Sequence, residues 1–160
     1  MKACRQKPVF LKKLQEQHPR STAFDTKAEA DIAAFRQRIS LLHESMDEWL
    51  AGTEIRTEAT ATSLIEFLIG GATFSVPGIA LHYAQRSIRF TPIFLYGQGV
   101  TGCIEVCLTA DSKIRPLYRL FMRSGEQDNW TWCPAGTQSG KPARFDEEAF
   151  FTMIAPLLPE

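Results

Sequence analysis

The chain has 160 residues, of which 44% are hydrophobic and 22% charged, and these fractions are typical of one globular domain. Its 18 basic residues balance its 18 acidic residues, which disfavours a dedicated nucleic-acid-binding domain, because such domains are normally basic as a whole. No stretch reaches the roughly 18 apolar residues that cross a membrane, and the N-terminus lacks the apolar run of a secretory signal. We therefore expect a soluble protein of the cytoplasm.

The first 24 residues are more basic than the rest of the chain. They contain six Lys or Arg residues and one Glu, so the remainder is net acidic. Residues 1–24 are predicted to be a loosely structured lead-in to a single domain over residues 25–160. Such a basic segment either folds against the acidic body of its own chain or contacts nucleic acid or a membrane surface.

Residues 27–51 form the clearest predicted element, a long amphipathic helix. Thr26 and Glu29 match a capping box, Asp25 is an alternative cap, and Gly52 supplies a stop. Apolar residues recur between them at steps of three and four, which places them on one helical stripe: Ile32, Phe35, Ile39, Leu42, Met46 and Trp49. The stripe also has heptad spacing, so it either packs in the core of the monomer or forms the seam of a homodimer.

The segment after this helix carries mixed signals. Ser63 and Glu66 form a second capping-box pattern around an apolar run, whereas the Thr-rich stretch before them is typical of a strand. We expect a strand near residues 55–59 and a short helix near residues 64–69, and a strand is the competing interpretation of the second segment.

From residue 72 onward, apolar residues alternate with a period of two, which predicts short strands. Their connections are short and turn-like, so the strands are expected to form an antiparallel meander: TFSV, IALHYA, SIRFT, IFLY, CIEVCL, RPLYRLFMR and NWTWC. A short helix closes the chain, with Asp146 as its cap, Phe145 and Phe150 as a hydrophobic staple, and Pro156 at its end. The predicted fold class is α+β, with a long N-terminal amphipathic helix and a short C-terminal helix packed on an antiparallel meandering β-sheet.

Gly97, Gly99 and Gly102 match the G-x-G-x-x-G spacing of a dinucleotide-binding loop. That loop binds its ligand because a helix begins at the third glycine and holds the pyrophosphate at its N-terminus. Residues 103–108 instead alternate as in a strand. The pattern therefore predicts a glycine-containing hairpin or bulge and no nucleotide cofactor.

Cysteines and histidines offer few candidate catalytic or metal sites. Cys103 and Cys107 lie four residues apart in a predicted strand, about 13 Å at strand rise, which is too far for a disulfide. The chain has no C-x-x-C pair, so a zinc site is poorly supported. No other cofactor is expected. His82 becomes the centre of a catalytic site only if Cys103, Cys107 or Asp111 lies beside it in space.

Two neighbouring strands near the end of the predicted sheet form the expected partner-binding face. Arg119, Phe121 and Arg123 point to one side of an extended strand, and Trp130 and Trp132 lie on the next strand. Arginine over tryptophan is a favourable cation–π arrangement, and both residue types are enriched at binding hot spots. The competing interpretation is an exposed strand whose arginine stems cover apolar neighbours.

These features favour a non-enzymatic protein-binding module, such as an adaptor, a chaperone-like protein or an immunity-type protein of a bacterial cytoplasm. The expected partner is another protein with an acidic surface, and a second copy of the chain is the other partner considered. Two alternatives remain open: a small hydrolase or transferase centred on His82, and a binder of single-stranded nucleic acid that uses the basic lead-in and the aromatic side chains. Nucleic acid is the less favoured partner because the net charge is zero, and no membrane partner is expected.

Overall fold

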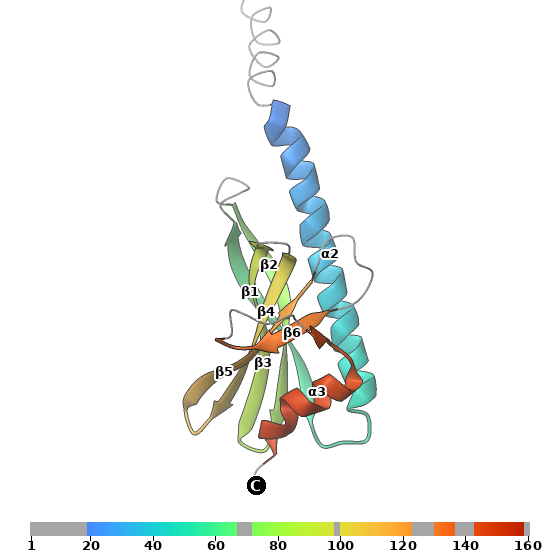
Figure 1. Ribbon diagram of the computed structural model, residues 1–160, viewed down its shortest axis with the longest axis vertical. Helices are drawn as coiled ribbons and strands as arrows, with labels where there is room; N and C mark the ends of the chain where they lie inside the picture. Colours follow the sequence, from blue (N-terminus) through green and yellow to red (C-terminus); the bar gives the residue numbers. More distant parts are fainter. Residues whose placement is uncertain (1–18, 67–71, 98–99, 123–129, 137–142, 159–160) are drawn as a thin grey trace, which may run out of the picture.

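The computed structural model describes residues 19–66, 72–97, 100–122, 130–136 and 143–158. In this part of the chain, seven strands pair in sequence order as one antiparallel sheet, with a long helix before it and a short helix after it (Figure 1). The elements, in chain order, are α2 (Pro19–Trp49), β1 (Arg56–Glu66), β2 (Ala72–Tyr83), β3 (Arg86–Gly97), β4 (Val100–Ala110), β5 (Lys113–Phe121), β6 (Thr131–Pro134), β7 (Ala143–Arg144), α3 (Glu147–Ile154) and the 3-10 turn η3 (Ala155–Leu157). The predicted α+β fold class and the meandering strand order are confirmed.

Helix α2 is longer than predicted. Its 31 residues extend back to Pro19, so Thr26 lies inside the helix rather than at its start. No glycine or proline lies between Pro19 and Gly52, and the sequence therefore contains no strong helix breaker in this stretch. Residues 19–24, which were expected to belong to the lead-in, are helical, and residues 1–18 lie outside the described residues.

The apolar stripe of α2 faces the protein's own core. Phe35, Ile39 and Met46 are buried, and Ile32 and Trp49 pack against the same cluster from partly buried positions. Core packing of the stripe from Ile32 to Trp49 is therefore confirmed. Neither α2 nor α3 is both long and apolar enough to cross a membrane, in the part of the chain that the structure describes.

Strand β1 replaces the strand and short helix that were expected after α2. It runs without interruption from Arg56 to Glu66, so the predicted helix is wrong at residues 64–66, and residues 67–69 lie outside the described segments. Every residue of β1 has a partner on β2, from Arg56 opposite His82 to Glu66 opposite Ala72. This continuous ladder outweighs the local capping-box pattern, because helix propensity is a weak preference that tertiary pairing overrides.

Strand β2 is also one strand where two were expected, because the chain stays extended through Pro77 and Gly78. A Cβ atom on Gly78 would clash with Oγ1 of Thr60 and lie 3.0 Å from the backbone carbonyl oxygen of Phe90, so this position favours glycine. β2 pairs with β1 along its whole length but with β3 only from Ile79 to Tyr83. β3 likewise joins two expected strands, with an irregularity in its pairing to β4.

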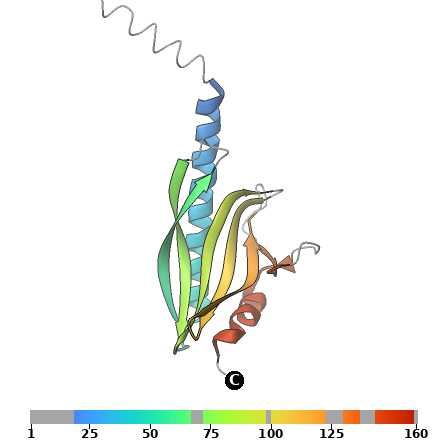
Figure 2. The ribbon, with the colours of Figure 1, turned by 90° about the vertical axis from the view of Figure 1, so that its left-hand side faces the viewer.

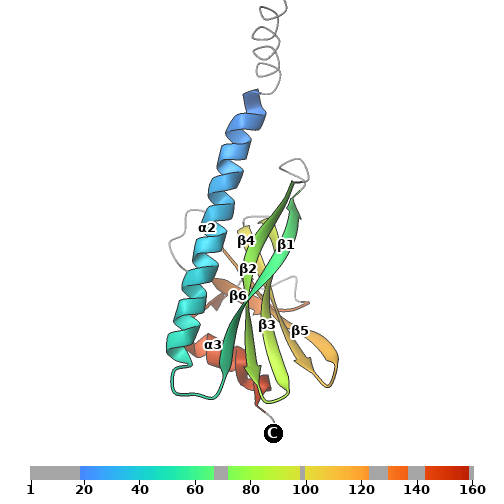
Figure 3. The ribbon, with the colours of Figure 1, turned by 180° about the vertical axis from the view of Figure 1, so that it is seen from behind.

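Both helices cover the same face of the sheet (Figure 3). The ring of Phe35 on α2 lies against Gly102 of β4, where a Cβ atom would come within 2.8 Å of it. The ring of Phe150 on α3 lies 6.4 Å from that of Phe90 on β3, and Phe90 is opposite Val106, which shares a face with Gly102. We call this the core face, and we call the opposite face, which no described helix covers, the outer face.

Helix α3 begins as predicted. The Asp146 side chain accepts a hydrogen bond from the backbone N–H of Ala149 at 2.8 Å, and the rings of Phe145 and Phe150 lie 6.4 Å apart as in a hydrophobic staple. Pro156 lies in η3, directly after the helix, which confirms the predicted end. No pattern in the sequence predicts β7, whose two residues pair with β6 just before the cap.

Candidate functional site

The pairing of β5 with β6 divides the predicted arginine–tryptophan face. Leu120 is directly opposite Trp132, and Arg119 is directly opposite Cys133. Because opposed side chains of an antiparallel pair share a face, Trp132 lies with buried Leu120 on the core face, whereas Arg119 lies on the outer face. The expected grouping of these side chains on one surface is therefore wrong, and Arg123 lies outside the described residues.

Trp130 is part of the core rather than of an exposed face. It is 5% exposed, and its ring centroid lies 6.3 Å from that of Phe35 on α2. The guanidinium carbon of Arg38, also on α2, lies 5.8 Å from the centroid of the Trp130 ring. A cation–π contact of the predicted kind is thus present, but the arginine comes from the helix and not from Arg119.

On the outer face, Arg119 has an acidic neighbour. Its Nη2 atom lies 3.6 Å from Oε2 of Glu105, which is directly opposite it on β4. Phe121 is on the same side of β5 and opposite Cys103. The ion pair with Glu105 neutralises part of the positive charge of Arg119. Arg119 should therefore attract an acidic partner less strongly than the sequence alone implied.

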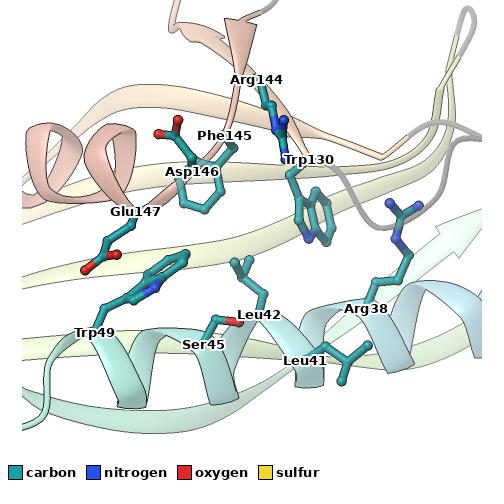
Figure 4. Close-up of a pocket in the computed structure, with 10 residues that line it drawn as sticks. All are labelled: Arg38, Leu41, Leu42, Ser45, Trp49, Trp130, Arg144, Phe145, Asp146 and Glu147. Carbon is teal, nitrogen blue, oxygen red and sulfur yellow. The ribbon is translucent and has the colours of Figure 1, made fainter.

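Trp130 lines a cavity of about 360 Å³ between α2 and the start of α3, which we call the aromatic cavity (Figure 4). Trp49 forms the other aromatic wall. Figure 4 shows two arginines, Arg38 and Arg144, at one end and the acidic residues Asp146 and Glu147 at the other. Because the opposite charges are balanced, the cavity does not favour a ligand of one sign.

A second hollow, at the end of the sheet near the β4–β5 turn, is strongly basic. Two adjoining cavities of about 480 and 740 Å³ share Arg86, Leu108 and Arg115 in their linings. We call their union the basic groove; its further lining residues are Ala110, Lys113, Ile114, Thr152, Ala155, Pro156 and Leu158. No acidic side chain is among the described residues that line it.

Strand register explains why the cations of the basic groove lie together. Arg115 on β5 is opposite Leu108 on β4, and Lys113 is opposite Ala110, so both cations occupy the core face beside the apolar floor. Arg86 enters from the first position of β3, and its Nη1 donates a hydrogen bond to the carbonyl oxygen of Pro156 at 2.9 Å. This bond holds one cation in position before any ligand arrives.

The sequence alone did not identify these cations as one group. Lys113 and Arg115 alternate on one strand, which is a signal for a shared face, but Arg86 is more than 20 residues away in the chain. Leu158, which is 52% exposed, adds an apolar rim to the groove, whereas Ile114 is opposite Thr109 on the outer side of β5. A hollow with cations, an apolar floor and an exposed apolar rim suits a ligand that is both acidic and apolar.

His82 does not lie in a catalytic arrangement with a cysteine. Its Nε2 atom lies 2.8 Å from Oε2 of Glu58 on β1, and it lines neither the aromatic cavity nor the basic groove.

Burial raises the pKa of Cys103 to about 12, although nearby Arg119 lowers it. Burial and a hydrogen bond to Glu105 raise the pKa of Cys107 to about 11. Both thiols are therefore protonated near neutral pH and are poor nucleophiles.

The glycine motif is part of a β-hairpin. Gly97 ends β3, and β4 runs on through residues 103–108, which confirms the predicted extended conformation; Gly99 lies outside the described residues. Gly102 has φ +124° and allows α2 to approach the sheet through Phe35. Within the described segments, no group of three His, Cys, Asp or Glu side chains is arranged to hold a metal ion.

The basic groove is the candidate functional site, because its described charged side chains are all cations, whereas the aromatic cavity carries both signs of charge. Comparisons of the chain with family models, with curated proteins and with solved structures find no match.

Proposed function

We propose that the protein is a non-enzymatic protein-binding module whose basic groove binds an acidic, amphipathic segment of another protein. One observation carries this proposal: Arg86, Lys113 and Arg115 surround the apolar side chain of Leu108, and no described lining residue is acidic. Carboxylates of the partner would lie near the cations, and an apolar side chain of the partner would cover Leu108. Adaptor, chaperone-like and immunity-type roles are versions of this proposal that differ in the partner.

The energies of ion pairs and of apolar burial explain why the ligand should be amphipathic rather than only acidic. An exposed ion pair contributes about 0.2–1 kcal/mol, so three such pairs alone give weak, salt-sensitive binding. Apolar burial adds about 25 cal/mol per Å² of covered surface, and the exposed side chain of Leu158 offers such surface in the groove lined by Leu108. Affinity from the apolar contacts would persist at high salt, whereas the contribution of the cations would fall.

The two alternative functions gain less support. A His82-centred enzyme lacks a neighbouring nucleophile of low pKa, since the thiols of Cys103 and Cys107 are held protonated. Single-stranded nucleic acid would need aromatic faces for stacking, and Trp130 is buried in the core. Phosphate contacts with the basic groove would remain, and the experiment below separates them from protein recognition.

The proposal is tested with a fluorescein-labelled peptide of alternating Glu and Leu residues, whose binding is followed by fluorescence anisotropy. The double variant Lys113→Glu/Arg115→Glu should bind about tenfold or more weakly, because two attractive pairs become repulsive. Arg89→Glu is the matched control, since Arg89 is an exposed cation of the same sheet on the outer face.

Three outcomes of this experiment would contradict the proposal. Equal affinity of the double variant and the wild type would place the peptide elsewhere on the surface. Because the control changes the net charge by half as much as the double variant, a control that loses about half as much binding free energy would show that net charge alone matters. An oligothymidine of matched charge that competes more strongly than the peptide would favour the nucleic-acid alternative.

A further inference from the structure

A cavity of about 570 Å³ adjoins the basic groove, and we call it the apolar pocket. It is bounded by the connection between α2 and β1, by the end of β2, and by α3 with the turn that follows it. In Figure 2, α3 and η3 lie at the end of the sheet that is farthest from the start of α2. The large apolar side chains that line the pocket are Ile55, Tyr83, Phe151, Ile154 and Leu158.

The apolar pocket is continuous with the basic groove. Ala155 and Leu158 line both of them. Tyr83, which lines the pocket, is directly opposite Arg86, which lines the groove, on the paired strands β2 and β3. The hydrogen bond from Arg86 to the carbonyl oxygen of Pro156 therefore lies next to the border between the two surfaces. A single extended ligand that crosses Leu158 would contact both.

The apolar pocket lies at one end of this continuous surface. The groove consists of two cavities, and the cavity lined by Lys113 overlaps the second cavity at Arg86 and Arg115. The second cavity overlaps the apolar pocket at Leu158. Among the described residues, the pocket shares no lining residue with the cavity that Lys113 lines. The cations therefore occupy one end and the middle of the surface, and the pocket occupies the other end.

Charge and exposure favour an apolar occupant of the pocket. Glu54 is the only charged side chain among its described lining residues, so an acidic group there would be repelled and would lose hydration without gaining a cation. Apolar surface is available instead, because Phe151 is 39% exposed and Leu158 is 52% exposed. The volume of the pocket lies within the usual range of ligand pockets, about 300–1,000 Å³.

We propose that the acidic segment bound by the basic groove is flanked on one side by an aromatic residue, and that this residue occupies the apolar pocket while the acidic residues lie along the cations. This inference rests on the proposed function and adds the order of residues that the partner must have. An aromatic side chain suits the pocket because it buries about 150–250 Å² and because aromatic residues in pockets are enriched among binding hot spots. A segment without this anchor would leave the pocket uncovered.

The test extends the fluorescein-labelled peptide of alternating Glu and Leu residues by two Trp residues, at the N-terminus in one probe and at the C-terminus in another, with the label at the opposite end. Matched probes carry two Ser residues in place of the Trp residues. One of the two Trp probes should bind at least about tenfold more tightly than its Ser counterpart, because the pocket lies at one end of the groove. Tenfold corresponds to about 1.4 kcal/mol, or to about 55 Å² of covered apolar surface.

A variant of the pocket locates the anchor. Phe151→Gln should remove most of the gain from Trp and leave the affinity for the Ser probes unchanged, because Phe151 lines the pocket and is not among the described residues that line the groove. Leu41→Gln is the matched control, since Leu41 is an apolar residue of α2 that is 47% exposed and lines the aromatic cavity. This control should retain the gain. Phe151→Leu is the milder change if Phe151→Gln does not fold, and it should lose part of the gain.

The anchor is wrong if neither Trp probe binds more tightly than its Ser counterpart, or if the Phe151 variants keep the full gain. Equal gains from Trp at both ends would contradict the single-ended order. A gain that is lost in Leu41→Gln but kept in Phe151→Gln would place the anchor in the aromatic cavity. The proposed function is tested separately by Lys113→Glu/Arg115→Glu with the unextended peptide, so a peptide that needs the cations but gains nothing from Trp contradicts the anchor alone.

Discussion

The hydroxyl of Tyr96 on β3 donates a hydrogen bond to Oδ2 of Asp31 on α2 at 2.6 Å. This contact joins the N-terminal half of α2 to the sheet. Burial raises the pKa of Tyr96 above its usual value of 10.0, and the hydrogen bond to Asp31 and the charges of Asp31 and Glu66 raise it further. The protonated phenol is thus the form that stabilises the fold.

This raised pKa predicts how stability changes at alkaline pH. The contribution of Tyr96 is fully present below its unfolded pKa of about 10 and is lost as the pH rises through the higher folded value. Tyr96→Phe should lower the free energy of unfolding by about 1 kcal/mol near neutral pH. Urea denaturation above about pH 10 should show a steeper loss of stability in the wild type than in Tyr96→Phe. Parallel curves for the two proteins would exclude this role.

Trp130 is expected to be a structural residue. Because it is 5% exposed and packs against Phe35, Trp130→Ala should lower the free energy of unfolding by about 3–5 kcal/mol. Arg119→Ala is the comparison, since the Arg119 side chain is 43% exposed and its ion pair with Glu105 is worth about 0–1 kcal/mol. Urea denaturation of both variants gives the measurement, with Trp130→Phe as a milder change if Trp130→Ala does not fold. Similar small losses at both positions would show that Trp130 is not a core residue.

At the scale of elements, α3 shows how a local signal and a tertiary contact support each other. Its cap at Asp146 can be identified from the sequence. Its buried side chains Phe150, Met153 and Ile154 depend on the tertiary structure, because they are buried in the core beside the sheet. η3 follows it directly and supplies the Pro156 carbonyl that holds Arg86. The short helix therefore builds one wall of the basic groove.

Loss of the Asp146 cap should destabilise the protein modestly. Asp146→Ala removes the acceptor for the Ala149 N–H and should lower the free energy of unfolding by about 1 kcal/mol. Asp146→Ser retains a cap and should restore most of that loss. Thermal or urea unfolding measures both. A variant pair with equal stability would indicate that core packing alone fixes the start of α3.

Strands and helices were predictable to different degrees. The stripe of α2 was predictable, because six apolar residues at helical spacing leave few alternatives for a segment of that length. The segment over β1 was not, because Ser63 and Glu66 imitate a helix start and only pairing with β2 decides between strand and helix. The two residues of β7 carry no pattern of their own, and they are a strand because β6 lies beside them.

At the scale of the whole molecule, helices cover the core face of the sheet, and no described helix covers its outer face. Helices α2 and α3 pack on the core face, and the basic groove lies where this face reaches the end of the sheet. Strand β1 forms one margin of the sheet, whereas the groove is formed by β3, β4, β5 and the C-terminal segment.

The sequence by itself determined the fold class, the core stripe of the long helix, the strand after Gly102 and the capped C-terminal helix, because each depends on residues close together in the chain. Only the tertiary structure decided which side chains share a surface. It separated Arg119 from Trp132, and it brought Arg86 beside Lys113 and Arg115. The physical reason is strand register: a one-residue shift between neighbouring strands moves every side chain to the opposite face, and the register is set by the turns and by which face is buried in the folded chain.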